Sequence, residues 1–170
     1  MTPPTTVDED RKVWPIVGES ATFRAFLRDE LLPEIDRRYR SNGDTAIIGE
    51  SLAGLFIVDT FFEAPGLFDT SIALSPSLWW NNHALVDAAP ARLQARASQP
   101  ERLYLSAADE TDIVPHVASL AEALAAHAPE TLQWTHAPRP DLRHDNIYRT
   151  VAPGVLRRMF APPQIATTTH

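Results

Sequence analysis

Apolar side chains near the start of this chain follow a helical spacing. Behind Ser20 or Thr22 as a cap, they recur at intervals of three and four residues, at Phe23, Phe26, Leu27, Leu31, Ile35 and Tyr39. This spacing predicts an amphipathic helix. Pro33 lies inside the helix and should kink it, because proline has no backbone N–H to donate.

Shorter apolar runs follow, and they lack the helical spacing. Residues 45–49 are rich in β-branched side chains and come after a Ser-Asn-Gly-Asp turn, which is typical of a strand buried on both faces. Further strands are predicted at residues 71–74, 102–106 and 132–136. Helices are predicted at residues 52–62, at 84–97, around Val117, Leu120, Ala121 and Leu124, and at 147–160 with a break or bend near Pro153.

Strands that alternate with helices indicate right-handed βαβ units, and therefore a parallel sheet with helices on both faces. We expect one α/β domain over residues 1–170, with an ordered core at about 13–160. The two ends, residues 1–12 and 161–170, are polar or punctuated by proline. Such segments are expected to be extended or disordered.

Composition narrows the class of partner. The chain has 170 residues, 44% of them apolar and 22% charged, with a formal net charge of −7. Because acidic and basic residues are interspersed, the charge argues against nucleic acid or an anionic membrane as a partner. There is no cysteine, which excludes disulfides and thiolate metal sites. With no secretory signal pattern in residues 1–11 and no apolar run of membrane-spanning length, we expect a cytoplasmic protein that acts on a small molecule.

Ser51 lies where the first predicted strand gives way to a helix, in the sequence Gly-Glu-Ser-Leu-Ala-Gly at residues 49–54. A serine in a sharp strand-to-helix turn, flanked by small residues, is the nucleophile elbow of α/β-hydrolases. The strict motif has glycine two positions after the serine, where this chain has Ala53 and then Gly54. In the alternative interpretation, the glycines only make a tight turn and Ser51 caps the helix.

A serine nucleophile needs a base and an orienting acid, and in α/β-hydrolases the chain order is serine, acid, histidine. Of the six histidines, His144 lies just after the last predicted strand and before the final helix, and is the base candidate. The acid is expected in the loop after residues 102–106, where Glu110 ranks ahead of Asp109 and Asp112. Alternatively, these acids only favour the N-terminus of the next helix, and His144 is an ordinary loop residue.

Two segments, TAIIGESLAGLF at residues 45–56 and LFDTSIALSPSLWWNN at residues 67–82, resemble the esterase family that includes enterobactin and ferric-siderophore esterases and relatives of S-formylglutathione hydrolase. The resemblance extends over nearly all of residues 3–160. It implies an α/β-hydrolase fold and a carboxylic ester hydrolase that needs no cofactor or metal. It also implies that Ser51 is the nucleophile and His144 the base.

The resemblance further implies a substrate pocket beside the elbow. Trp79 and Trp80 follow the second predicted strand at the carboxyl edge of the sheet, where α/β proteins bind ligands. With Glu50, they are the candidates for contact with an ester substrate. At least one of the two tryptophans is equally well explained as a core residue.

Full-length members of this family begin with further strands that this chain does not contain, and with a loop that supplies a second oxyanion-hole amide. One such donor remains, the backbone N–H of Leu52. Residues 45–49 would then form an exposed sheet edge, through which a homo-oligomer could form. Two functions follow: a hydrolase of siderophore-type esters, or a catalytically weak or inactive remnant that serves as a binding or partner-dependent module.

Overall fold

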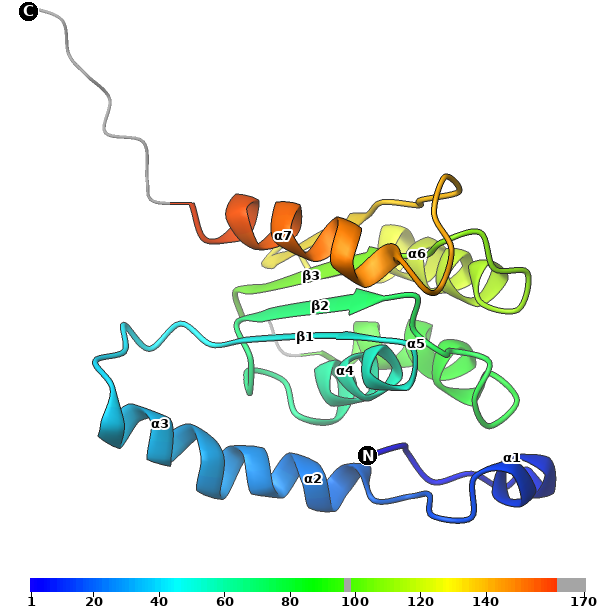
Figure 1. The fold of residues 1–170 in the computed structure, drawn as a ribbon, viewed down its shortest axis with the longest axis horizontal. Helices are drawn as coiled ribbons and strands as arrows, with labels where there is room; N and C mark the ends of the chain where they lie inside the picture. Colours follow the sequence, from blue (N-terminus) through cyan, green and yellow to red (C-terminus); the bar gives the residue numbers. More distant parts are fainter. Residues whose placement is uncertain (97–98, 162–170) are drawn as a thin grey trace, which may run out of the picture.

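The computed structural model describes residues 1–96 and 99–161, which form a parallel sheet with helices on both faces (Figure 1). The four strands are hydrogen-bonded in the order β1-β2-β3-β4. They are β1 (Ala46–Glu50), β2 (Thr70–Leu74), β3 (Glu101–Ser106) and β4 (Leu132–His136). The helices are α1 (Asp8–Val13), α2 (Ser20–Phe26), the π-helix η1 (Leu27–Leu31), α3 (Leu32–Arg38), α4 (Leu52–Glu63), α5 (Ala84–Gln94), α6 (Val114–His127) and α7 (Ile147–Met159). The predicted α/β class and all four predicted strands are confirmed.

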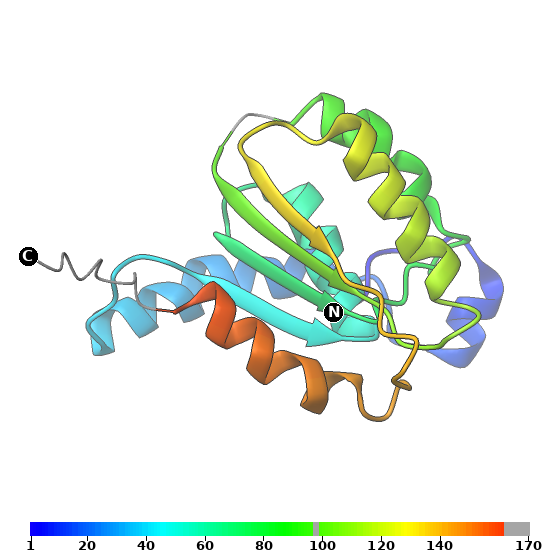
Figure 2. The same ribbon diagram turned by 90° about the horizontal axis from the view of Figure 1, so that it is seen from above.

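Alternate side chains of the inner strands face opposite helical layers. Ala73, Leu103 and Leu105 pack into one core with residues of α4, α5 and α6. Ile72 and Tyr104, their neighbours along the strands, pack into a second core with α7. Figures 1 and 2 show the same division, with α7 on one face of the sheet and α4 to α6 on the other. The sheet is thus covered on both faces, as its apolar strands require.

The register of the sheet brings the ends of its strands together. Glu50 at the end of β1 is paired with Leu74 at the end of β2, and Leu74 with Ser106 at the end of β3. Since all the strands are parallel, the loops that follow them leave from one edge. This carboxyl edge holds the candidate residues of the site.

The predicted amphipathic helix is present, but its middle differs from a simple kink. Between α2 and α3, η1 forms a π-helical turn, in which the Leu32 N–H donates to the Leu27 carbonyl. Pro33 follows at the start of α3. Because proline lacks an N–H and its ring crowds the preceding turn, a wider turn ahead of it accommodates the ring within a continuous helix.

Two other helices also differ from the prediction. The last helix, α7, continues through Pro153 without a break. Helix α5 ends at Gln94, short of the predicted end at residue 97, which lies outside the described residues. Within the described part of the chain, no helix is both long enough and apolar enough to cross a membrane.

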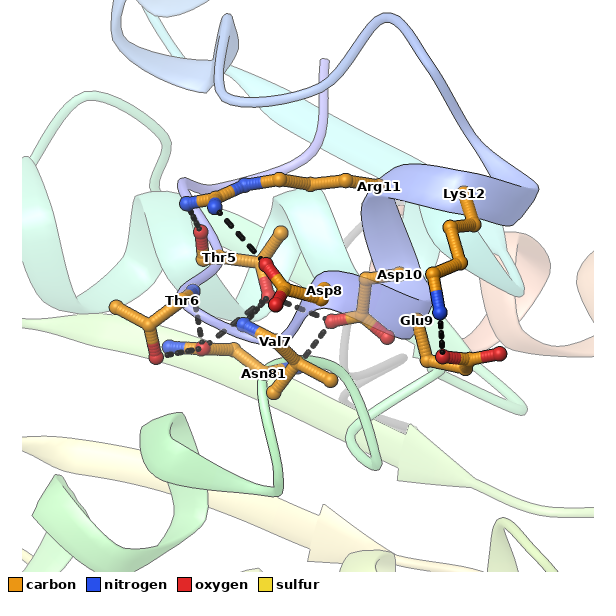
Figure 3. A network of polar contacts seen from close by, with 9 residues as sticks. All are labelled: Thr5, Thr6, Val7, Asp8, Glu9, Asp10, Arg11, Lys12 and Asn81. Carbon is orange, nitrogen blue, oxygen red and sulfur yellow. Dashed lines mark hydrogen bonds and ion pairs between the residues drawn. The ribbon is translucent and has the colours of Figure 1, made fainter.

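The N-terminal segment is not the extended or disordered end that its composition led us to expect. It contains α1, and the side chains of Thr2 and Thr5 are buried. Figure 3 shows its polar contacts: Thr5 donates to Asp10 at 2.6 Å, and Asp10 accepts from the Asn81 N–H at 3.1 Å. Hydrogen bonds to Asn81, which is distant in sequence, hold this segment against the rest of the protein. The spacing of apolar residues cannot predict such bonds. The predicted flexible C-terminal end lies outside the described residues from residue 162 on.

Candidate active site

Ser51 occupies a sharp turn between β1 and α4. Its backbone angles, φ 59° and ψ −124°, are rare for a residue with a side chain and are strained. Its N–H donates to the Leu74 carbonyl at 3.0 Å, which fixes the turn to β2. Neighbouring glycines make room: a Cβ on Gly49 would lie 2.8 Å from that of Ala53, and one on Gly54 would lie 3.0 Å from the Pro76 Cα. The backbone therefore has the geometry of a nucleophile elbow.

Leu52 is the first residue of α4, directly after Ser51. The N–H groups of a first helical turn have no acceptor within the helix. An amide in this position is available to an anion or a developing oxyanion beside the serine. The Leu52 N–H is thus the first amide of α4 and lies directly after Ser51 in the chain.

The loop after β2 lies against the elbow and contributes residues that sequence reasoning did not single out. Ser77 is buried, its N–H donates to the Ser51 carbonyl at 3.1 Å, and its Oγ lies 3.3 Å from the Ser51 Oγ. Ser75 is completely buried and has a positive φ of 39°. The signal for both was available in the sequence, because Ser-Pro-Ser directly follows β2, the strand next to the one that leads to Ser51.

His144 and Glu110 are brought together from separate loops. The His144 Nδ1 is hydrogen-bonded to the Glu110 Oε1. Glu110 is mostly buried, whereas the His144 side chain is 46% exposed. The described structure gives no hydrogen bond from His144 to Asp109 or Asp112, the two competing acids. Glu110, the first-ranked candidate, is therefore the acid in contact with the histidine.

A third residue holds the acid. The second carboxylate oxygen of Glu110 accepts a hydrogen bond from the Ser75 hydroxyl. Ser75 Oγ accepts in turn from the Ala108 N–H at 3.1 Å. A mostly buried carboxylate with both oxygens hydrogen-bonded is fixed in orientation, and Oε1 is thereby kept on the ring nitrogen. The chain from Ala108 to His144 thus orients the imidazole.

Glu50 approaches the other nitrogen of the same ring. Its Oε1 lies 4.0 Å from the His144 Nε2, and its side chain is 23% exposed. Burial raises the pKa of the Glu50 carboxyl, the nearby His144 opposes that rise, and the negative charge of Glu110 adds to it. The imidazole therefore lies between two carboxylates.

Ser51 and His144 each contact a neighbour other than the expected partner. Among the described residues, the Ser51 hydroxyl is hydrogen-bonded to Ser77, and Nε2 of His144 faces Glu50. Catalytic hydrogen bonds are commonly long in structures without substrate and tighten in the complex. For Ser51 and His144 to form a hydrogen bond, the imidazole would have to move from Glu50 toward the Ser51 hydroxyl.

The two tryptophans differ in their surroundings. Trp80 is 2% exposed, belongs to the core and donates its indole N–H to the Pro3 carbonyl at 3.1 Å. Trp79 is half-buried, and the Trp14 ring lies 5.5 Å from it and 5.6 Å from Trp80. The structure thus has Trp80 as the core residue of the pair and leaves Trp79 partly exposed.

A cavity of about 380 Å³ lies away from the candidate site, between the N-terminal segment, α4 and α5. Trp80 lines it, and so do Arg24 and Asp59. These two residues form a buried ion pair, with 2.9 Å between Arg24 Nη1 and Asp59 Oδ2. Its lining does not include Ser51 or His144. Among the described residues, no group of three or more histidines and acids could hold a metal ion.

Comparison with known proteins gives one family and several relatives. Residues 9–143 match the family model described as "Putative esterase". The ferri-bacillibactin esterase BesA of Bacillus subtilis is 33% identical over 103 residues, 59% of this chain and 36% of that protein. The siderophore enterobactin esterase of Emericella nidulans is 38% identical over 72 residues, 41% of this chain and 24% of that protein.

A solved structure agrees in fold. The BES protein from Bacillus cereus superposes with a TM-score of 0.80 at 24% identity, and the match covers 92% of this chain and 60% of that one. The matches thus cover 36% and 24% of the two curated relatives and 60% of the solved structure, in each case less than two thirds of the relative's length. At 24% identity, this likeness shows that the two proteins share an α/β-hydrolase-like fold and shows nothing beyond the fold.

Proposed function

Since the chain belongs to the esterase family, we propose that it hydrolyses carboxylic esters, with Ser51 as the nucleophile and His144 as the base. The observation that carries this proposal is the hydrogen-bonded chain from Ser75 through Glu110 to the His144 Nδ1, beside a serine in a strained strand-to-helix turn. Such a chain orients a histidine for proton transfer.

In the proposed reaction, the His144 Nε2 takes the Ser51 hydroxyl proton as the Oγ attacks the ester carbonyl carbon. The Leu52 N–H donates to the oxyanion of the tetrahedral intermediate. His144 then protonates the leaving alcohol, which gives an acyl-enzyme. Water, deprotonated by His144, releases the acid and restores Ser51. Glu110 stabilises the imidazolium in both halves of the reaction.

The substrate proposed is a siderophore-type ester, because one relative is named as a siderophore enterobactin esterase and another as a ferri-bacillibactin esterase. Trp79, half-buried on the loop after β2, is the proposed aromatic contact, since an aromatic face suits catecholate or acyl groups. Hydrolysis of enterobactin compared with p-nitrophenyl acetate tests this choice. A preference for the small ester would contradict the siderophore assignment and leave the esterase proposal standing.

Covalent labelling with a fluorophosphonate probe tests the nucleophile and the base. We expect wild type to be labelled, Ser51→Ala to be unlabelled, and His144→Ala to lose most of the labelling. Ser119→Ala and His127→Ala are matched controls, because the Ser119 hydroxyl donates to the Pro115 carbonyl of its own helix and His127 contacts Gln94. No labelling of folded wild-type protein would contradict the proposal.

One observation favours a second function, that of a weak or inactive remnant which binds a ligand or partner. The hydrogen bonds of Ser51 and the contacts of His144 do not join the two residues. Binding of enterobactin by calorimetry without labelling or hydrolysis would favour this alternative.

A further inference from the structure

Two carboxylates lie at the two nitrogens of the His144 ring. Glu110 is bonded to Nδ1, and Glu50 Oε1 lies 4.0 Å from Nε2. In the proposed reaction Glu110 has a role, but Glu50 has none. Yet Glu50 faces the nitrogen through which His144 must accept the Ser51 proton.

We propose that Glu50 is a positioning residue that acts on His144: its carboxylate holds the protonated ring and competes with the Ser51 hydroxyl for Nε2. The inference rests on the proposed function and deepens it. It assigns a role to the residue next to the nucleophile that is different from contact with substrate.

The backbone limits where the Glu50 carboxylate can go. Glu50 is the last residue of β1 and is paired in the sheet with Leu74. Its neighbour Ser51 is fixed by a hydrogen bond to the Leu74 carbonyl. His144 comes from a loop and its side chain is 46% exposed. The imidazole is therefore less constrained by its surroundings than Glu50. A positively charged ring would be held where the Glu50 carboxylate lies.

The charges around the ring come from three segments. Glu50 faces it from β1 and Glu110 from the loop after β3. On its own loop, Arg143 and Asp145 are paired with each other at 3.7 Å and are well exposed. Glu50 is thus the carboxylate opposite Nε2. Because its side chain is only 23% exposed, solvent screens its charge less than it screens the exposed pair of Arg143 and Asp145.

The direction of the effect follows from the charge. An ionised Glu50 favours the protonated ring, which cannot accept the serine proton. A neutral ring is not attracted to Glu50, and its Nε2 is available to Ser51. Removal of the carboxylate should therefore allow Ser51 to react at lower pH.

The test is the rate of fluorophosphonate labelling from about pH 5 to 9, the range in which histidine titrates. With Glu50→Gln, the pH of half-maximal rate should fall by about half a unit to one unit, a typical effect of one nearby charge. Below that pH the variant should be several-fold faster than wild type. Asp145→Asn removes a carboxylate beside His144 that pairs with Arg143, and should leave the profile within about 0.2 unit.

An unchanged midpoint, or one at higher pH, would overturn the inference. Glu50→Asp, which withdraws the carboxylate by one methylene, should give an intermediate shift and serves if the glutamine variant does not fold. The His144 Cε1–H resonance, followed by NMR against pH in the same variants, gives a readout without catalysis. If wild type is never labelled, the proposed function fails, and the NMR midpoint still decides whether Glu50 holds the protonated ring.

Discussion

Strands β1 and β2 lie side by side and are made of similar residues, but the protein covers them differently. Every residue of β2 is buried. In β1 only Gly49 is buried, Ala46 is exposed and the others are intermediate. Within the described residues β2 has a neighbour on each side, whereas β1 pairs with β2 alone. Ser51, the proposed nucleophile, thus follows the less covered strand, while Ser75 and Glu110, which are proposed to orient His144, follow β2 and β3.

The largest effect expected from this difference is on stability. Ile72 and Ile48 are partners in the register and pack toward the same core, but Ile72 is fully buried and Ile48 is only half-buried. Ile72→Ala should lower the free energy of unfolding by about 2 to 5 kcal/mol, since it leaves a cavity. Ile48→Ala should cost about 1 kcal/mol, because part of the Ile48 surface is already in contact with water in the folded protein. Urea unfolding measures both, and equal losses would contradict the comparison.

A smaller effect is expected at the ends of the strands. Ser75→Ala leaves the buried Ala108 N–H without its acceptor and Glu110 without its donor. Loss of one such partner costs about 1 to 3 kcal/mol. We expect a matching loss of stability and labelling by the fluorophosphonate about tenfold slower at pH 7, because the acid is no longer fixed on His144.

Ser77→Ala is the matched control for that variant. Ser77 is also buried, but its hydroxyl has only a long 3.3 Å contact with Ser51. Its loss should cost less than about 1 kcal/mol and change labelling less than about threefold. If both variants behave alike, the Ser75 hydrogen bonds do not orient the acid.

The smallest change in stability is expected at the free edge of β1, which we propose as the contact through which two copies pair. An edge strand offers unpaired N–H and C=O groups to another chain, and a lysine there opposes pairing. The mass from light scattering should rise with concentration for wild type, and Ala46→Lys should keep it at that of one chain. Its unfolding free energy should change by less than about 0.5 kcal/mol.

Gln133→Lys provides the comparison at the other end of the sheet. It places the same charge at an exposed position of β4, the other outer strand of the described sheet. This variant should associate as wild type does. A wild-type mass of one chain at every concentration would refute pairing through β1.

Much of the fold could be predicted because its strands are buried apolar runs. The runs at residues 45–49 and 71–74 stand out against polar turns, and Ser51 follows directly from the first. The contact of His144 with Glu110 agrees with the serine, acid, histidine order of α/β-hydrolases and with the place of Glu110 in the loop after β3. What could not be predicted depends on partners distant in sequence: Thr5 and Asp10 meet Asn81, and Trp14 meets Trp79. The polarity of the N-terminal residues alone does not indicate that they contact residues so distant in sequence.

The sequence left open which of the two tryptophans is buried, and the π-helical turn was missed, for a related reason. The loop after β2 exposes one tryptophan and buries its neighbour according to where the N-terminal segment lies. The turn at η1 depends on how the backbone adapts to Pro33, and the apolar spacing is the same with or without it. Periodicity predicts which face is apolar, and leaves the local backbone undetermined.

The strand order has a consequence for the way the protein folds. Each strand lies next to the strand that follows it in the chain, so the sheet can grow by addition of successive βα units. Helix α7 is the exception, since it comes last in the chain yet packs beside β1, the first strand (Figure 2). Docking of α7 closes the longest loop of the fold and should be among its late steps, with its amides the first to exchange in native-state hydrogen exchange.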